Sequence, residues 1–511
     1  MGLRASCLDV LARGRALYKE LVSTAVSEGY QLTESALRLL ERCEDPLGAL
    51  MSVISKLRAE EPAAVVIDLQ HIKQVAGVDV QEPLAEQSEK RVEKREEIDT
   101  LQHAANYQVI QLCGDETRIE GTIDEFIEYF RSRYYKLRRI IERRRDKFIP
   151  VSELSNLQDG REASIVAMVM EKQEGSKALM LTCDDPSGTI RVAVPKSNNG
   201  LYEQAENILN DQVIGLKLRR SNSIFIAQDI YFPDVEIRRR DNDLGSIPQL
   251  YACLISDIHV GSKKFREDLF ERFLDWLSRG RDGVVKRLKY VVVNGDLIDG
   301  IGVYPGQDKE LATTDVEEQL RMAAKLLGEI PRHIEVIVCP GNHEPVRKAL
   351  PQPALQQRHR SILAEHRAIT FGTNPAHLVV EGRKILVYHG QGLEEVIQSL
   401  PNISYSTLRE NMDRVMLALI RARHLAPSYG ENTQLMPLGD DPLVIEEPPD
   451  LLHTGHIHIA HTTSYRGVQL VNSGTWQDQT SFQKSLGLEP TIGTAVLLEL
   501  STMHASVRYF S

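Results

Sequence analysis

The chain has 511 residues, of which 42% are hydrophobic and 26% charged, a composition typical of a globular protein that is too long for a single core. Its net charge of −11 excludes a protein that coats nucleic acid over its whole surface, because phosphate binding needs concentrated Lys and Arg. No apolar run reaches the roughly 18 residues of a membrane helix and the six cysteines lack paired spacing, so we expect a cytoplasmic protein without membrane contact.

The first 151 residues divide into three segments. Residues 1–75 have helical periodicity and predict a small helical N-terminal module, whereas residues 76–104 predict a charged linker. Residues 105–151 predict a basic helical segment with interleaved aromatic side chains. This segment is a candidate nucleic-acid contact, and the candidate residues are Arg138, Arg139, Arg143 and Arg144. A solvated helix face or a partner surface explains the same pattern equally well.

Residues 152–235 carry five short apolar runs separated by turn signals, with a helical stretch after the third run. This order predicts an OB-fold β-barrel domain. Such a barrel is either a platform for single-stranded nucleic acid or a brace for a neighbouring domain, and the sequence favours neither.

Residues 249–511 alternate apolar strand-like runs with amphipathic helices, which predicts a layered α/β domain. Thr314 and Glu317 have the spacing of a capping box that would open a helix ending at Leu327. A segment from about 391 to 449, with a helix near 406–423, is a candidate partner contact. With the upstream segments, we expect a multidomain α+β protein.

Five short blocks of possible metal ligands occur in this last half. They are Asp257-Ile258-His259, Gly295-Asp296 followed by Asp299, Gly341-Asn342-His343-Glu344, His389-Gly390, and Gly455-His456-Ile457-His458. Each block follows or ends a short apolar run, so each is expected at a strand end, where α/β sheets bind ligands. A single His of this kind is usually a core residue, but five blocks in series predict one common site.

The residue types suit two divalent cations that clamp a phosphate ester. Asp257 and His259 are two residues apart at a strand end and would point the same way, and Asp296 suits a bridge between the ions. Asn342 offers a neutral oxygen, which leaves His343 for acid/base chemistry. The remaining residues of the set are expected to bind the ions, as His456 and His458 do, or to orient the ligands, as Asp299, Glu344 and His453 do.

The five blocks, in their order, resemble those of the calcineurin-like metallophosphoesterases, and the resemblance spans residues 249–511. Longer strings resemble the small subunits of the archaeal D-family DNA polymerases more specifically. These strings are Ser256 to Ser262, Gly300 to Gln307, His453 to His458 and Gly474 to Gln477. The resemblance implies a four-layer α/β/β/α phosphoesterase (nuclease) domain.

The resemblance also implies an activity and partners. Family members are 3′–5′ exonucleases that proofread for a separate large catalytic polymerase subunit, act on DNA with a 3′ end and work with other replication proteins. By position, one ion would be held by Asp257, His259, Asp296 and His458, and the other by Asp296, Asn342, His389 and His456. The ions would be manganese or magnesium, and His343 would protonate the departing 3′ oxygen. Glu344 departs from the pattern, since many nucleases of the superfamily have Asp there.

Two other functions remain open at this point. Protein phosphatases resemble the site, but they usually carry an Arg in the second block, where this chain has Gly300 after Asp299. A scaffold subunit without catalysis is the other alternative, because the accessory B-type subunits of eukaryotic polymerases share this architecture and have lost their metal ligands. Every ligand position is filled in this chain, which favours an enzyme.

Overall fold

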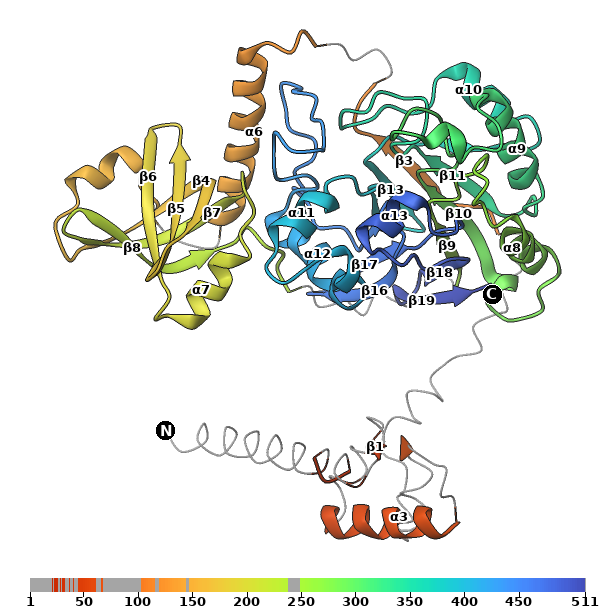
Figure 1. The fold of residues 1–511 in the computed structure, drawn as a ribbon, viewed down its shortest axis with the longest axis horizontal. Coiled ribbons are helices and arrows are strands. Elements are labelled where there is room, and N and C mark those ends of the chain that lie inside the picture. The colour runs from red at the N-terminus through yellow and green to blue at the C-terminus, as the bar shows by residue number, and fades with distance from the viewer. Residues whose placement is uncertain are drawn as a thin grey trace. The chain divides into compact units, whose positions relative to one another are not determined.

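The computed structural model describes residues 21, 23–25, 28, 30–32, 36, 40, 45–60, 66–67, 103–114, 119–143, 147–237 and 249–510. They belong to two units, 1–97 and 98–511 (Figure 1). In the first unit, helix α3 (Pro46–Glu60) buries Leu50, Val53 and Ile54, and strand β1 (Gln31–Leu32) pairs with β2 (Val66–Ile67). The predicted linker at 76–104 lies almost entirely outside the described residues.

The second unit contains two six-stranded sheets. The first has the order β12-β11-β10-β9-β18-β19. Its strands are β9 (Tyr251–Ile255), β10 (Leu288–Asn294), β11 (Glu335–Cys339), β12 (Thr370–Phe371), β18 (Thr494–Glu499) and β19 (His504–Tyr509). Strands β9 to β12 run parallel, with Ile255 opposite Val293 and Asn294 opposite Cys339. The carboxyl ends of β9, β10 and β11 therefore meet at one edge of this sheet.

The second sheet has the order β16-β17-β15-β14-β13-β3. Its strands are β3 (Tyr107–Gln111), β13 (Ala376–Val380), β14 (Arg383–Val387), β15 (Leu451–Thr454), β16 (Ala460–Tyr465) and β17 (Val468–Ser473). Strands β14, β15 and β17 are parallel. The strand β3 was not predicted, because residues 105–151 were interpreted as helical throughout; it pairs antiparallel with β13 and so ties the segment before the barrel into the later domain.

Alternating side chains of the two sheets build three apolar layers. Ala252, Leu254 and Val292 of the first sheet pack with Leu378 and Ile385 of the second, between the sheets. The outer face of the first sheet is covered by α8 (Glu267–Arg279), α9 (Val316–Gly328) and α10 (Gln357–Leu363), and that of the second by α11 (Leu393–Ser399) and α12 (Leu408–Ala422). The order is therefore helices, sheet, sheet, helices.

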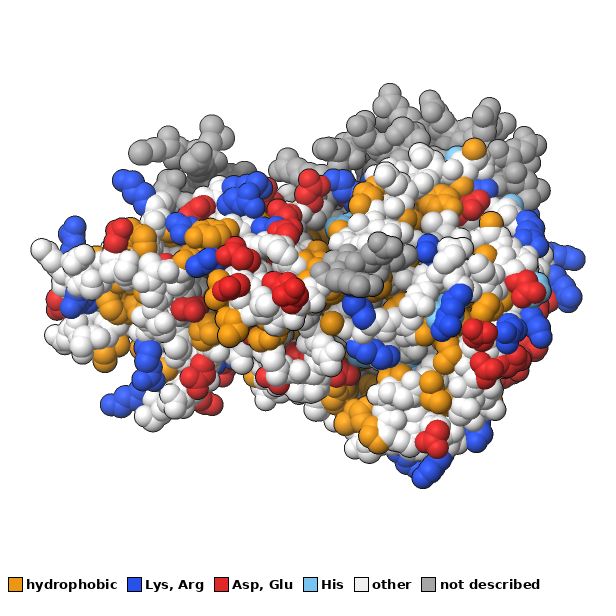
Figure 2. Space-filling model, turned by 90° about the horizontal axis from the view of Figure 1, so that it is seen from above, with side chains coloured by type: hydrophobic (Ala, Val, Ile, Leu, Met, Phe, Trp, Pro, Cys, Tyr) orange, Lys and Arg blue, Asp and Glu red, His pale blue; other side chains and the backbone are white. Residues whose placement is uncertain are grey.

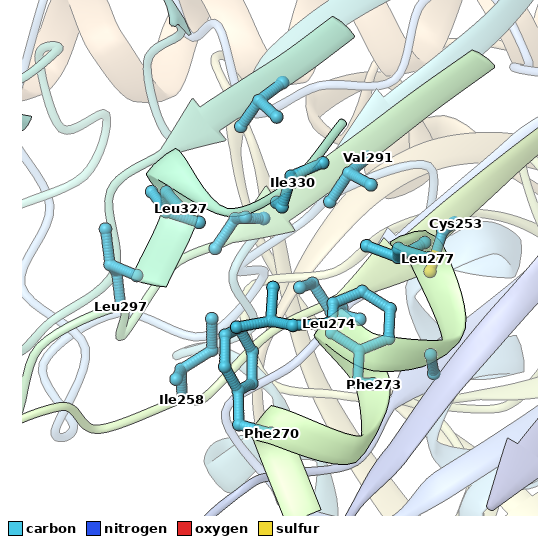
Figure 3. Packing of buried hydrophobic residues seen from close by; sticks show 14 of the residues in the cluster. Cys253, Ile258, Phe270, Phe273, Leu274, Leu277, Val291, Leu297, Leu327 and Ile330 are labelled. Atoms are coloured by element: carbon cyan, nitrogen blue, oxygen red, sulfur yellow. The ribbon is translucent and has the colours of Figure 1, made fainter. Parts of the chain in front are cut away.

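Helix α8 shows why this sequence makes these elements. Its apolar residues repeat at helical spacing and put Phe270, Phe273 and Leu274 on one buried face. Figure 3 shows these side chains beside Val291 of β10. Acidic residues occupy the first turn and Arg279 the last, where each charge complements the helix dipole.

The predicted helix near Thr314 begins one residue later than expected. Asp315 caps α9, and its carboxylate accepts hydrogen bonds from the N–H groups of Glu317 and Glu318 at 2.9 and 3.3 Å. The prediction of Thr314 as the cap was wrong because Asp and Thr are comparable caps and the sequence offered both side by side.

Five strands between α6 and the last domain form a closed barrel in the order β4-β5-β6-β8-β7. They are β4 (Glu162–Glu174), β5 (Ala178–Asp185), β6 (Gly188–Pro195), β7 (Val213–Ser221) and β8 (Ile224–Tyr231), with helix α7 (Asn199–Glu206) between β6 and β7. The barrel contacts the later domain directly, since the Tyr429 N–H donates to Asp211 at 2.8 Å and Tyr465 donates to Asp234 at 2.9 Å. Every described helix is too short or too polar to cross a bilayer.

Helix α6 (Ile123–Glu142) joins these parts through a buried ion pair. Arg133 is fully buried and donates to Asp441 at 2.8 Å and to the Pro427 carbonyl at 2.6 Å. His424 contacts the same carboxylate at 2.9 Å. Burial opposes ionisation of Asp441, but His424 and Arg133 outweigh it and lower its pKa. Part of the basic segment thus has a packing role.

We expect Arg133→Met to lower the free energy of unfolding by about 3–5 kcal/mol, because it leaves the Asp441 carboxylate buried without its cation. Urea unfolding measures the change. The double variant Arg133→Met with Asp441→Leu should lose clearly less than the sum of the two single variants. Simple addition of the two losses would show that the pair is not coupled.

Candidate metal centre

The five blocks lie at the carboxyl ends of β9, β10, β11, β14 and β15, so the two sheets supply one site together. Five of its residues have left-handed backbones, with φ between 51° and 65°: Asp257, His259, Asp296, His456 and His458. Such conformations are costly for non-glycine residues and cluster at functional sites. The alternation of a strand was therefore the wrong reason for expecting Asp257 and His259 to converge, since both lie beyond the end of β9.

Three glycines let the loops approach one another. A Cβ atom on Gly341 would lie 2.3 Å from Asp296 Oδ1 and 2.8 Å from His389 Nε2. A Cβ on Gly295 would meet His389 Nδ1 at 2.3 Å, and one on Gly455 would meet Asp257 Oδ2 at 2.5 Å. The glycines of the blocks are thus required by space around the possible ligands.

One group of possible ligands consists of Asp257, His259 and His458, whose ligand atoms lie within 4.8 Å of one another. His458 Nε2 is 3.3 Å from Asp257 Oδ1 and 3.1 Å from His259 Nε2. His259 Nδ1 bonds to Asp299 at 2.9 Å, so its Nε2 lone pair faces this group. All three side chains are buried.

A second group consists of Asp296, His389 and His456, again within 4.8 Å. His389 Nε2 lies 3.2 Å from Asp296 Oδ2 and 3.0 Å from the Asn342 Oδ1 atom. The Nδ1–H of His389 donates to the Asn294 carbonyl at 2.9 Å, which leaves Nε2 to face the group. Asn342 therefore joins the same cluster as the sequence predicted.

Asp296 lies between the two groups. Its Oδ2 atom is 4.0 Å from His259 Nε2 as well as 3.2 Å from His389 Nε2. Burial opposes its ionisation, but the neighbouring His389 and His343 outweigh burial and hold the pKa of Asp296 well below its usual range. Burial also disfavours the charged form of His389, yet Asp296 raises the pKa of His389 to about 10. The site therefore favours positive charge next to this carboxylate.

His343 faces the groups from the β11 loop. Its backbone N–H donates to Asp296 Oδ1 at 2.9 Å, and its Nδ1–H donates to the Asp299 carbonyl at 2.6 Å. Nε2 is thereby turned to the cavity, 3.8 Å from Asp296 Oδ2. Burial lowers the pKa of His343 to about 4.

Two of the three residues expected to orient the ligands do so in the structure. Asp299 contacts His259, and His453 reaches Asp257 indirectly: its Nε2 is 3.0 Å from the Ser473 hydroxyl, which donates to Ser256 at 2.7 Å. Ser256 in turn donates to the Asp257 carboxylate.

Glu344 has a different position from the one expected. Its buried carboxylate accepts hydrogen bonds from the backbone N–H groups of Asp296, Leu297 and Gly341 at 3.0, 2.7 and 2.6 Å. It thus fastens the β10 loop to the β11 loop and does not orient the His343 ring. Its longer side chain is what lets it span both loops.

The sequence interpretation missed three polar residues around the ligands. Glu394 of α11 accepts from His456 Nε2 at 3.1 Å, and Gln483 of α13 (Ser481–Leu486) lies 2.8 Å from His458 Nδ1. Gln477 donates to Asp299 at 3.2 Å. Gln477 belongs to a string already quoted for its resemblance, whereas Glu394 carries no sequence signal beyond its helix.

The candidate nucleic-acid residues lie apart from these groups, on α6. Arg138 pairs with Glu142 at 2.7 Å, Arg139 and Arg143 are exposed, and Arg144 lies outside the described residues. On the face shown in Figure 2, Lys and Arg side chains are interspersed with Asp and Glu side chains.

The residues present fit divalent cations. Carboxylate, imidazole and amide donors converge from five loops, and the glycines leave no space for other side chains among them. A cavity of about 240 Å³ opens onto His259, Asp296, Asn342, His343, His456 and His458, so an ester could reach these atoms. The arrangement can therefore hold two cations beside an open pocket.

Comparison with known proteins identifies the class. The family model that describes the B-type subunit of the alpha and epsilon DNA polymerases matches residues 252–463, which places the chain among the accessory subunits of DNA polymerases. The chain is 32% identical to the DNA polymerase II small subunit of Methanothermobacter thermautotrophicus, over 95% of this chain and 98% of the relative. It belongs to the family of archaeal DNA polymerase II small subunits.

Other similarities differ in extent. The small subunit of Archaeoglobus fulgidus is 39% identical over 76% of this chain and 78% of its own length. That of Pyrococcus horikoshii is 37% identical over 75% of this chain, which spans 62% of that longer relative. Among solved structures, an archaeal phosphodiesterase aligns with 51% of this chain and 99% of its own, at 10% identity and a TM-score of 0.24, a value from which we infer no common fold.

We expect Gly341→Ala to weaken manganese binding at least tenfold, because the new methyl group displaces Asp296 or His389. Titration calorimetry with manganese measures the change. Gly439→Ala is the matched control, since a Cβ there meets no atom within 4 Å. Equal affinities in the two variants would contradict this account of the glycine.

Proposed function

We propose that this subunit is a metal-dependent 3′–5′ exonuclease that removes nucleoside 5′-phosphates from DNA ends and supports synthesis by a large catalytic subunit. The observation that carries the proposal is the convergence of seven donor side chains beside one cavity. A scaffold subunit has no need for buried carboxylates surrounded by imidazoles, which are expensive to bury unless they have a charged ligand.

The two groups correspond to two ions. One would be held by Asp257, His259, Asp296 and His458, and the other by Asp296, Asn342, His389 and His456. Manganese or magnesium suits these mixed donors. When bound, such a pair lowers the pKa of a water molecule and stabilises the charge on the attacking and leaving oxygens of a phosphodiester.

His343 is proposed to protonate the departing 3′ oxygen. Its Nδ1–H is committed to the Asp299 carbonyl, so only Nε2 can exchange a proton with a bound ester. Burial disfavours the imidazolium, but the negative charge of a phosphodiester in the cavity would favour it. The acid form is thereby coupled to substrate binding.

The rest of the chain is proposed to bind DNA and partners. The barrel has the strand order and the helix position of an OB fold, which supports a role in holding single-stranded DNA. The last domain has the layers of a calcineurin-like phosphoesterase. Arg139 and Arg143 are exposed on α6 and remain candidates for phosphate contact, with Arg138 and Arg144 beside them in sequence.

His343→Ala should reduce release of mononucleotides from a 3′-mismatched primer by about 10²-fold or more, as expected for loss of a general acid. The assay uses purified protein, manganese, and the large subunit in a parallel reaction. His366→Ala, which removes an exposed histidine outside the site, is the control. Equal rates for His343→Ala and the parent would refute the role of His343.

Glu394→Gln should weaken manganese binding by roughly 10- to 100-fold, because Glu394 holds the His456 Nε2–H and so keeps Nδ1 free for the second group. Glu394→Asp should recover part of the loss. Calorimetry at constant pH compares the variants. An unchanged affinity in Glu394→Gln would show that the hydrogen bond has no orienting role.

A further inference from the structure

Two aromatic side chains form one wall of the cavity that contains the candidate ligands. Tyr304, in the loop after β10, and Phe482, on α13, have ring centroids 6.0 Å apart and an angle of 19° between their planes. Both line the same cavity as His259, Asp296 and His343. Phe482 is 53% exposed, an unusual position for a large apolar side chain that no metal ligand requires.

The Tyr304 side of this wall is fixed relative to the site. Gln307 accepts from the Val303 N–H at 2.9 Å and donates to the Asp299 carbonyl at 2.7 Å. Since the same carbonyl accepts from His343, the loop that carries Tyr304 is joined to the candidate acid through one oxygen atom. Movement of the loop would therefore disturb the site.

The Phe482 side is fixed in a similar way. The residue next to it, Gln483, contacts His458 at 2.8 Å, so helix α13 both holds a possible ligand and presents the ring. Glu310 connects the two sides, because it accepts from the Tyr304 hydroxyl at 3.2 Å and from Ser481 at 2.5 Å. The pair is thus a rigid platform whose distance from the ligands is set by direct hydrogen bonds.

The size and surface of the cavity indicate what the platform binds. At about 240 Å³ it lies below the roughly 300–1,000 Å³ of drug-sized pockets, so it admits a single nucleotide and not a duplex end. Aromatic faces stack on bases of any identity, because every base has a π face. A base within a duplex has both faces covered by its neighbours, so only an unpaired one can use this wall.

We propose that Tyr304 and Phe482 stack on the base of the unpaired 3′-terminal nucleotide and so place its phosphodiester over the metal centre. This inference rests on the proposed exonuclease function and adds the form of its substrate: a single-stranded DNA end, accepted without regard to base identity. A paired end must open before it is cleaved, whereas a mismatched end is already open.

The test uses a single-stranded oligonucleotide with 2-aminopurine at its 3′ end, whose fluorescence is quenched on stacking. Binding is measured with manganese in the His343→Ala background, so that hydrolysis does not consume the probe. Phe482→Ala and Phe482→Leu should bind the end roughly tenfold more weakly and lose the quenching, while Phe482→Trp should retain both. Tyr509→Ala, which removes an exposed aromatic residue on β19, is the matched control.

Hydrolysis with native His343 separates the two proposals. Phe482→Leu should raise KM for single-stranded ends about tenfold and lower kcat much less, because stacking acts on binding. Equal KM and equal quenching in Phe482→Leu and the parent would overturn the platform and leave the exonuclease standing. If the parent releases no nucleotide, the exonuclease fails, and loss of quenching in Phe482→Leu would still support the platform.

Discussion

The buried carboxylate of Asp296 is the group on which the arrangement of the site depends. It accepts the His343 N–H, faces His389 at 3.2 Å and lies between the two groups of possible ligands. A charge in such a position is stable only if positive charge or hydrogen-bond donors surround it. The imidazoles, the close-packed glycines and the left-handed backbones of the loops are all explained by the need to surround this oxygen pair.

The two sheets meet that need from opposite sides. Strands β9, β10 and β11 deliver Asp257, Asp296 and His343, and β14 and β15 deliver His389 and the His456 loop. Because the apolar layer between the sheets fixes their separation, the distance between the two sets of ligands is a property of the core. Glu344 adds a direct link between the β10 and β11 loops through backbone N–H groups. Stability and site geometry are therefore coupled.

The order of strands and the blocks at their ends could be read from the sequence, since apolar runs and ligand spacings are local signals. The strand β3 could not, because its pairing with β13 depends on residues more than 250 positions away. Glu394 was missed for the same reason: a glutamate on a helix becomes a partner of His456 only in the folded chain. The Asp257 and His259 pair was expected for the wrong geometric reason, because left-handed turns cannot be told from a strand end by spacing alone.

The aromatic wall gives the site a way to select among DNA ends, and the barrel and α6 connect it to the rest of the polymerase subunit. Selection and chemistry share atoms, since the Asp299 carbonyl serves both the Tyr304 loop and His343. This sharing predicts that an end that cannot stack is also positioned poorly for hydrolysis.

The central claim is that two cations share the Asp296 carboxylate. Electron paramagnetic resonance of the purified chain titrated with manganese tests it directly, because two manganese ions joined by one carboxylate are spin-coupled and differ from isolated ions. The account predicts two tightly bound ions per chain with a coupled spectrum, and loss of the coupling in Asp296→Asn. A single uncoupled ion in the parent, or a coupled pair that survives in Asp296→Asn, would contradict it.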